Sequence, residues 1–327
     1  MAVNRRQFLI GAAGTALASI QGFAQTAKSA RLGTLTVGPP YDPKAGRGAI
    51  IIAALAKRGY VLGQNLAYEA RGAAGKHDQL PRLMQELKAA DIGVVLTVGY
   101  PAAVTAKGSG IPTVIAGGAG DPVATGLVES LARPGGNVTG ISDDAAMLST
   151  KRLGLLKELS PQLHQVAMLW NKDDLAMSHR YEASAKAAQF IGVTVQPLGV
   201  REPNDFEEAF AAMNREPPDA ILMVSDSLTL LNRKRVVNYA AERRIPAIYE
   251  GDVVVRDGGL MSYGPDDNET LDRAAHLAVR IFSGAKPSDL PVEQPTRYLF
   301  VVNLKTAKAM GLAVPNTLLA LADELIE

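Results

Sequence analysis

Residues 121–142 read DPVATGLVESLARPGGNVTGIS, and this stretch decides the architecture that we predict. It opens with a strand-end loop at Asp121-Pro122, continues as a short apolar helix, and breaks at Arg133-Pro134-Gly135-Gly136. The β-prone run 137–141 follows the break and begins a new element, because adjacent Gly and Pro residues end regular structure. Similar patterns precede and follow the stretch, which indicates a junction between two lobes.

Apolar strand runs alternate with amphipathic helical runs on both sides of the junction. The strand runs are 31–37, 65–71, 92–98 and 111–116 before it, and 165–170, 193–198, 220–224 and 245–249 after it. Helical spacing marks 50–58, 80–87 and 102–107 before the junction, and 153–159, 177–190, 205–214 and 228–243 after it. This alternation predicts an α/β protein with two doubly wound, Rossmann-like parallel sheets in tandem.

The last part of the chain predicts further crossings between the lobes. A strand at 260–263, a helix at 268–282, a strand at 298–302 and helices at 304–310 and 318–326 follow two complete lobes. We therefore expect crossings near 262–265 and 287–291, which make a three-segment hinge. Lobe one would comprise 31–141 plus about 264–287, and lobe two about 142–263 plus 288–327. The candidate hinge residues are Asn137, Thr139, Gly140, Ser142, Ser262, Gly264 and Pro265.

Residues 1–24 have the features of a twin-arginine signal peptide. An Asn4-Arg5-Arg6-Gln7-Phe8-Leu9 segment precedes the apolar run 10–20, and Gly22-Phe23-Ala24 matches a small-x-small cleavage site. The apolar run is too short to span a membrane. We therefore predict export to the periplasm and a mature chain without a membrane span.

Composition and motifs exclude several classes of function. A net charge of +1, with both signs interspersed, gives no basic surface for nucleic acid, and the chain has no Cys for disulfides or thiolate ligands. No cofactor is expected, because 33–38 lacks dinucleotide-binding spacing and 72–77 lacks the Ser or Thr of a P-loop. The four histidines are far apart, so we predict no metal site. No heptad pattern indicates association, so we expect a monomer.

Small, polar and aromatic residues gather at the predicted strand ends. In open α/β sheets the ligand lies outside the carboxyl ends of the strands, so two facing lobes predict a cleft. The candidates from lobe one are Thr36, Val37, Gly38, Thr97, Gly99, Tyr100, Gly117, Gly118 and Asp121. The candidates from lobe two are Trp170, Asn171, Ser225, Asp226, Ser227, Tyr249 and Glu250. No catalytic residue is assigned. Two alternatives stay open: Trp170 as a core aromatic, and the carboxylates as helix or turn caps.

With these residues placed, the chain resembles the ABC-transporter substrate-binding family that includes bacterial tryptophan- and tyrosine-binding proteins. The resemblance rests on GYVLGQNL at 59–66, DPV at 121–123, SLARPGGNVTG at 130–140, GGLMSYGP at 258–265, LPVEQPT at 290–296 and NLKTA at 303–307. It implies the type I periplasmic-binding-protein fold, no catalysis, and delivery of a small solute to an ABC permease in the inner membrane. Gly99-Tyr100-Pro101 departs from the family's Gly-Thr-Pro turn, and Gly117-Gly118-Ala119-Gly120 makes the next strand end more open than usual.

We expect closure of the lobes over an amino acid or an aromatic carboxylate. Closure would bring Trp170, Ser225 and Tyr249 over the ligand, while Thr36, Thr97, Asn171 and Asp226 would supply polar contacts. Two other functions remain open from the sequence. One is a sensor subunit that signals to a membrane kinase, and the other is a hydrolase that uses Asp121 or Glu250.

Overall fold

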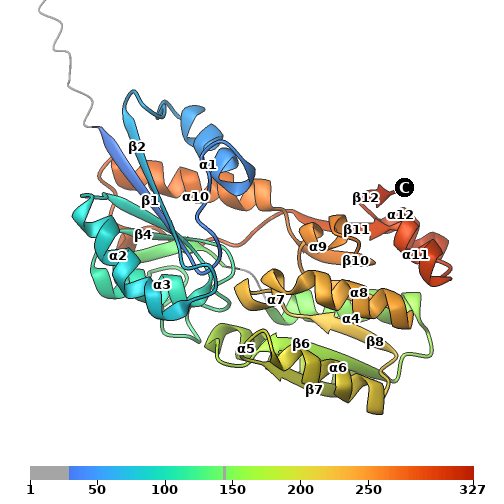
Figure 1. Cartoon of the computed structure of the whole chain (residues 1–327). Coiled ribbons are helices and arrows are strands. Elements are labelled where there is room, and N and C mark those ends of the chain that lie inside the picture. The colour runs from blue at the N-terminus through green and yellow to red at the C-terminus, as the bar shows by residue number, and fades with distance from the viewer. Residues whose placement is uncertain (1–28, 143–144) are drawn as a thin grey trace, which may run out of the picture.

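The computed structural model describes residues 29–142 and 145–327, which form two α/β lobes joined along one side (Figure 1). The predicted signal peptide, residues 1–24, lies outside the described residues. Within the described ranges, no helix has the length and apolar character that a membrane crossing needs. Both sheets are predominantly parallel and covered by helices on both faces, so the predicted fold class is confirmed.

Lobe one contains a five-stranded parallel sheet in the order β2-β1-β3-β4-β5. Its strands are β1 (Ala30–Thr36), β2 (Leu66–Gly72), β3 (Val94–Val98), β4 (Thr113–Ala116) and β5 (Val138–Ile141). Its helices are α1 (Gly46–Ala56), α2 (Leu80–Ala89), α3 (Tyr100–Ser109) and α10 (Asp267–Phe282), with the 3-10 turns η1 (His77–Gln79) and η2 (Pro287–Asp289). Helices α1 and α10 share one apolar cluster, and α2 and α3 share another on the opposite face. Near-continuous apolar strands fit this burial on both faces.

Lobe two contains a seven-stranded sheet in the order β12-β11-β10-β9-β8-β6-β7. Its strands are β6 (Gln165–Asn171), β7 (Thr194–Val200), β8 (Ala220–Met223), β9 (Ala247–Tyr249), β10 (Met261–Pro265), β11 (Tyr298–Asn303) and β12 (Glu324–Ile326). Its helices are α4 (Ala145–Leu159), α5 (Leu175–Phe190), α6 (Asp205–Arg215), α7 (Ser227–Leu231), α8 (Arg233–Arg243), α9 (Asp252–Arg256), α11 (Leu304–Met310) and α12 (Asn316–Leu321). Strands β10 and β11 pair antiparallel, because the chain leaves the lobe after β10 and returns in the opposite direction.

The chain passes between the lobes after β5, after β10, and again before β11. Strand β10 pairs with β9 and β11 in lobe two, whereas the next helix, α10, packs against α1 and β4 in lobe one. The return follows Leu290 and Val292, which are buried in lobe one. The first and third crossings are bonded to each other: the Glu293 N–H donates to Gly140 O at 2.8 Å, and the Ser142 N–H donates to Glu293 O at 2.8 Å.

The candidate hinge residues occupy different positions relative to these crossings. Gly140 and Ser142 lie at the first crossing, while Asn137 precedes β5 and donates its side-chain N–H to Ile111 O at 2.8 Å. Thr139 lies in β5, and its hydroxyl donates to Leu290 O at 2.8 Å. Ser262, Gly264 and Pro265 belong to β10 within the lobe-two sheet. The second crossing therefore lies just beyond Pro265, and the third lies beyond the expected 287–291.

Three expectations about local structure are wrong. Residues 122–132 form turns and not a helix: Gly126 has a φ of +71°, and the Asp121 carboxylate accepts the Val123 N–H at 2.9 Å. The helix expected at 228–243 is divided into α7 and α8 at Asn232. The helix expected at 318–326 ends at Leu321, and the chain continues as β12 because residues 324–326 pair with the edge strand β11.

Candidate functional site

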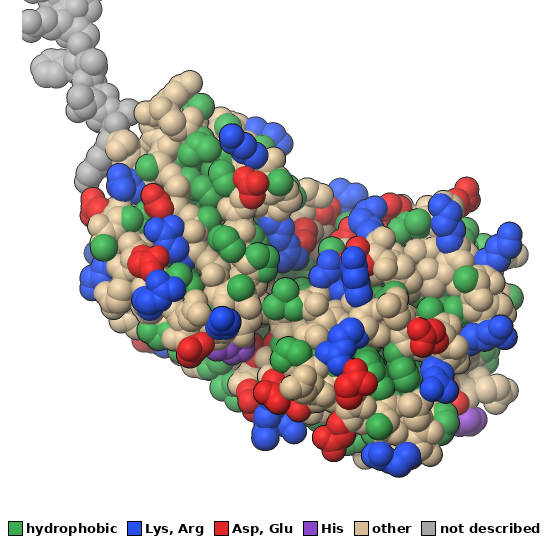
Figure 2. Space-filling view, in the orientation of Figure 1, with side chains coloured by type: hydrophobic (Ala, Val, Ile, Leu, Met, Phe, Trp, Pro, Cys, Tyr) green, Lys and Arg blue, Asp and Glu red, His purple; other side chains and the backbone are tan. Residues whose placement is uncertain are grey.

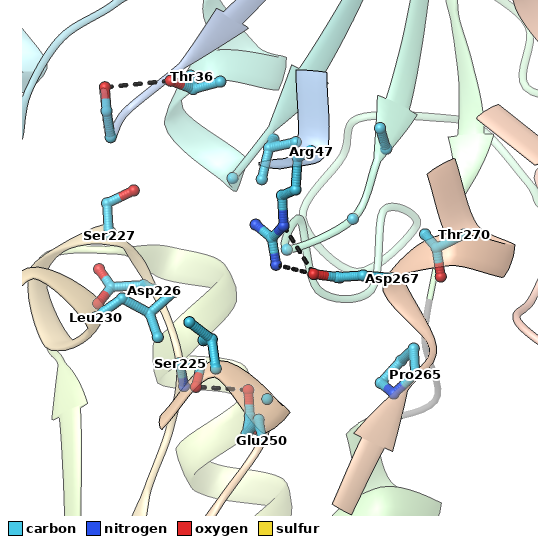
Figure 3. Close-up of a pocket in the computed structure, with 18 of the residues that line it drawn as sticks. Thr36, Arg47, Ser225, Asp226, Ser227, Leu230, Glu250, Pro265, Asp267 and Thr270 are labelled. Atoms are coloured by element: carbon cyan, nitrogen blue, oxygen red, sulfur yellow. Dashed lines mark hydrogen bonds and ion pairs between the residues drawn. The ribbon is translucent and has the colours of Figure 1, made fainter. Parts of the chain in front are cut away.

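A cleft of about 600 Å³ lies between the lobes at the carboxyl ends of both sheets. Figure 2 shows the surface hollowed between the two lobes, and Figure 3 shows side chains from both lobes facing the hollow. This volume is in the range of sites that enclose a small molecule. The position agrees with the expectation from the strand ends.

Nine of the predicted ligand-binding residues line this cleft, and seven do not. The nine are Thr36, Gly38, Gly99, Gly117, Gly118, Ser225, Asp226, Ser227 and Glu250. The hinge candidates Ser142 and Pro265 also line it. The seven residues outside the lining are Val37, Thr97, Tyr100, Asp121, Trp170, Asn171 and Tyr249.

The lobe-one wall presents backbone and short side chains. The Thr36 hydroxyl at the end of β1 donates to Pro39 O at 2.9 Å and fixes the loop that enters the cleft. Gly99, Gly117 and Gly118 have φ angles of +90°, +115° and +70°, which favour glycine. Because these residues have no side chains, a ligand can approach the backbone closely there.

The ion pair between Arg47 and Asp267 lies on the lobe-one side of the cleft (Figure 3). Arg47 comes from the first turn of α1, and its Nε and Nη2 atoms lie 2.8 and 2.6 Å from Oδ2 of Asp267, the first residue of α10. Its Nη1 donates to the Tyr41 hydroxyl at 3.3 Å. Burial opposes the charged form of Arg47, but Tyr41 and Asp267 outweigh burial and raise the pKa of Arg47 above its usual range.

The strand-end pattern does not predict this ion pair, because neither residue lies at the end of a strand. Arg47 and Asp267 both lie at helix starts, and α10 reaches lobe one only through the second crossing. One signal was available in the sequence. Asp267 follows directly after the predicted second crossing, where the chain must pass the cleft.

The lobe-two wall contains a buried group of charges centred on Glu250. Its carboxylate oxygens lie 2.8 Å from Arg152 Nη1 and 3.0 Å from Arg180 Nη1, and they accept the Ser225 N–H at 3.1 Å. The side chains of Arg152, Arg180 and Glu250 are 1%, 3% and 7% exposed. Arg152 Nε also donates to Tyr263 O at 2.7 Å, so the group connects α4 and α5 with two strand ends. Both arginines were missed because they come from helix interiors.

Asp226 caps α7 and also lines the cleft. Its Oδ1 accepts the Thr229 N–H at 2.8 Å, its own N–H donates to the Thr229 hydroxyl at 2.9 Å, and Asn171 Nδ2 donates to its Oδ2 at 2.6 Å. The alternative of a capping carboxylate therefore describes the local role of Asp226. Asn171 lies behind the wall and holds this carboxylate in place.

Asp174 is a buried carboxyl group near the contact between the lobes that sequence analysis did not single out. It caps α5 by accepting N–H groups of Ala176 and Met177 at 2.9 and 3.3 Å. Burial, followed by the charge of Asp226, raises the pKa of Asp174 to about 7, although the two N–H groups and Arg180 act in the opposite direction. Burial, with a smaller effect of Asp174, raises the pKa of Tyr100, which packs against apolar clusters of both lobes.

Trp170 and Tyr249 are core residues of lobe two. Trp170 is 9% exposed and stacks on Tyr181 with ring centroids 3.7 Å apart and planes at 6°. Tyr249 is fully buried, and burial raises its pKa. Strand alternation explains the position of Trp170, because its side chain shares one face of β6 with Val166 and Met168. Neither aromatic ring lines the cleft.

Two residues that line the cleft have buried hydroxyl groups without a hydrogen-bond partner among the described residues. They are Thr270 on α10 and Ser225 after β8. Thr97, which sits behind the wall in β3, likewise has an unpartnered buried hydroxyl in the described chain. The described residues contain no group of three or more acidic or His side chains able to hold a metal ion.

The two sheets, the shared cleft and the repeated crossings define a two-lobed α/β protein with a cleft between the lobes, as in the type I periplasmic-binding-protein fold. The family model described as "ABC transporter substrate binding protein" matches residues 44–326, and the chain belongs to this family. A curated relative is the tyrosine-binding protein of Clostridioides difficile strain R20291. It is 25% identical over 287 residues, which cover 87% of this chain and 81% of the relative. The family inferred from the motifs is therefore confirmed.

Solved structures of similar proteins share the fold. A conserved domain protein from Vibrio cholerae aligns with a TM-score of 0.84 at 22% identity, covering 91% of this chain and 100% of that one. An ABC domain in complex with L-Trp from Streptococcus pneumoniae aligns with a TM-score of 0.83 at 24% identity over the same shares. A ligand-free, open substrate-binding protein with adhesive properties from Clostridium difficile has a TM-score of 0.66 at 24% identity, with 91% and 99% covered.

Proposed function

We propose that this chain captures an amino acid or an aromatic carboxylate in the cleft and delivers it to an ABC permease of the inner membrane. The observation that carries the proposal is a cleft of about 600 Å³ between the strand ends of both lobes. The tyrosine-binding relative and the structure that holds L-Trp support this choice of solute. The chain acts in the periplasm after export by its twin-arginine signal, as a monomer without catalytic activity.

Affinity requires both apolar burial and polar contacts. Burial of an aromatic solute of about 150–250 Å² supplies roughly 4–6 kcal/mol at about 25 cal/mol per Å². Micromolar affinity needs about 8 kcal/mol, so polar groups must add to burial. Thr36, Ser225 and Asp226 of the wall supply these contacts, while Thr97 and Asn171 act from behind it. Leu230 and Ile50 supply apolar contacts from opposite lobes.

Closure proceeds by bending at the crossings. The bonded segments around Gly140 and Glu293 and the extended residue Asp266 connect the lobes, and the ligand contacts both walls when the lobes approach each other. Binding therefore shifts the population toward the closed form, which the permease recognises.

A thermal-shift screen of the purified protein against amino acids and aromatic acids tests the proposal. We expect amino acids or aromatic carboxylates to raise the melting temperature, and mass spectrometry of the co-purified ligand to find a molecule of the same class. No stabilisation by any compound of either class would overturn the choice of solute.

A pair of substitutions tests the location of the site. Leu230→Trp fills the cleft from lobe two, so the ligand-induced shift should disappear. Leu321→Trp adds the same ring at a residue outside the cleft lining that is 51% exposed, and the shift should remain. Equal shifts in the two variants would place the ligand elsewhere.

A further inference from the structure

Charged side chains of both signs line the cleft in balance. The described lining residues of positive charge are Arg47, Arg152, Arg180 and Arg233, and those of negative charge are Asp226, Glu250, Asp252 and Asp267. A ligand with a net charge would disturb this balance in a partly desolvated space, where an uncompensated charge is unfavourable. A zwitterion adds one charge of each sign and leaves the balance unchanged.

The pair Arg47–Asp267 differs from the other ion pairs of the wall. Its side chains are 34% and 44% exposed, and both line the cleft. The pair Arg152–Glu250 is 1% and 7% exposed, so its members have little access to solvent. The partners of Arg233 and Asp252 are Asp257 and Arg256, which lie outside the cleft lining. Among the described ion pairs of the cleft, Arg47–Asp267 is thus the pair in which both side chains are accessible to a ligand.

The geometry of this pair suits exchange with a ligand. Nε and Nη2 of Arg47 both contact Oδ2 of Asp267, so the guanidinium meets one carboxylate oxygen and not both. A ligand carboxylate can accept two parallel N–H bonds from the same guanidinium, which is the stronger arrangement. The released Asp267 carboxylate can then accept hydrogen bonds from a ligand ammonium group.

Neighbouring residues extend the site on both helices. Thr270 lies one turn beyond Asp267 on α10, is 5% exposed, and has a hydroxyl without a partner among the described residues. Ile50 lies one turn beyond Arg47 on α1 and lines the cleft. Ile50 thus offers an apolar surface one turn from Arg47, and Figure 3 shows Thr270 on the same helix as Asp267.

We propose that the Arg47–Asp267 pair opens to receive the zwitterionic head of an α-amino acid. The ligand carboxylate binds Arg47, and the ligand ammonium binds Asp267. This inference rests on the proposed solute-binding function and deepens it. It assigns amino acids, and not aromatic carboxylates that lack an amine, as the ligands of this cleft.

Calorimetric titration with matched compounds tests the inference. The probes are L-tryptophan, L-tyrosine, indole-3-propionate, which lacks the ammonium group, and tryptamine, which lacks the carboxylate. Wild-type protein should bind L-tryptophan or L-tyrosine at least about tenfold more tightly than either truncated compound, because each truncated compound leaves one residue of the pair without its charged partner.

Two substitutions connect each ligand group to one residue. In Arg47→Gln the preference for tryptophan over tryptamine should fall toward one, because the ligand carboxylate has lost its partner. In Asp267→Asn the preference for tryptophan over indole-3-propionate should fall instead. Arg58→Gln is the matched control. Arg58 lies just after α1 and pairs with Asp272 of α10 at 2.7 Å, but neither residue lines the cleft.

The outcomes separate this inference from the proposed function. Unchanged preferences in Arg47→Gln and Asp267→Asn, with tryptophan still bound, would overturn the inference and leave the binding function intact. Wild-type protein that binds indole-3-propionate as tightly as tryptophan would also overturn it. If wild-type protein binds none of the four compounds, the aromatic solute class fails, and the inference fails with it. If Arg47→Gln does not fold, Arg47→Lys, which keeps the charge but loses the planar fork, should still weaken tryptophan binding.

Discussion

In lobe one, the charged pair Arg47–Asp267 is 34% and 44% exposed at the cleft, whereas in lobe two Glu250 is 7% exposed between two arginines that are still more buried. Both groups stand at the carboxyl ends of a parallel sheet and line the same cleft. The difference lies in their attachment. The lobe-one pair joins two helices at the surface, while the lobe-two group connects α4, α5, the middle of β10 and the ends of β8 and β9.

This difference in burial predicts two different roles for the charged groups. Buried pairs keep their geometry because separation leaves charge in a medium of low dielectric constant. Half-exposed pairs lose little when water or a ligand replaces one partner. We therefore regard the lobe-two wall as a fixed scaffold and the lobe-one wall as the adaptable side of the site.

The largest expected effect is a difference in protein stability between substitutions in the two charged groups. Glu250→Gln removes the carboxylate that contacts Arg152 and Arg180 and should lower the free energy of unfolding by about 3–5 kcal/mol. Asp267→Asn should lower it by less than about 1 kcal/mol, because its pair is half-exposed. Urea denaturation measures both. Similar losses in the two variants would contradict the division into scaffold and adaptable wall.

Measurement of the free energy of unfolding against pH tests whether burial of Asp174 opposes ionisation of its carboxyl group. The pKa of Asp174 is raised to about 7, against about 3.9 for an ordinary Asp. The folded state thus binds this proton more tightly, and the free energy of unfolding falls as the pH rises from about 4 to about 7.

Asp174→Asn keeps an oxygen for the α5 cap and removes the charge. It should raise the free energy of unfolding by about 2 kcal/mol near pH 8 and change it little near pH 4. Asp173→Asn is the control, because the Asp173 side chain is 58% exposed. A difference that stays constant from acid to alkaline pH would show that the charge of Asp174 is not responsible.

A substitution at Gly120 tests how closely the lobes must approach. A Cβ atom there would lie 2.8 Å from the Ala176 Cβ of lobe two, whereas one at Gly126 would meet nothing within 4 Å. Both residues have positive φ angles, of +65° and +71°, so backbone strain is similar. Gly120→Ala should weaken L-tryptophan or L-tyrosine binding about fivefold, or about 1 kcal/mol, and Gly126→Ala should not. If calorimetry finds equal affinities for the Gly120→Ala and Gly126→Ala variants, then the contact between Gly120 and Ala176 does not limit closure.

The smallest effect concerns Trp170, the one tryptophan in the chain. Its ring stacks on Tyr181 within the lobe-two core and not in the cleft. Addition of L-tyrosine should therefore leave the emission maximum, excited selectively at the indole band, almost unchanged. A large shift would mean that binding in the cleft repacks the core of lobe two, and lobe two would then not be a fixed scaffold.

Most strands could be predicted because buried parallel strands are short apolar runs between Gly and Pro breaks. The stretch 92–98 is one such run, and it contains the central strand β3. Prediction failed where distant pairing decided the structure. Residues 324–326 continue a helical pattern locally. However, β11 would otherwise be the edge strand of the sheet, and these residues pair with it as β12.

The candidate site was predictable only where it follows strand ends. Thr36, Gly117 and Ser225 were found by that rule, since parallel strands end at a common edge. Arg47 and Arg180 were not, because a helix residue reaches the cleft only through a packing arrangement that no local pattern specifies. Trp170 could have been placed in the core by counting alternate residues along β6.

The bonds that join the first and third crossings determine how the lobes can move. Two backbone hydrogen bonds join residues 140–142 to Glu293 as an isolated parallel β-bridge, and Arg273 of α10 holds the Glu293 carboxylate at 2.6 and 2.9 Å. Sliding of one segment past the other would break both hydrogen bonds, whereas a joint rotation of the two segments keeps them. In the closure that we propose, the first and third crossings therefore turn together, and a ligand that enters the cleft meets the same two surfaces each time the lobes close.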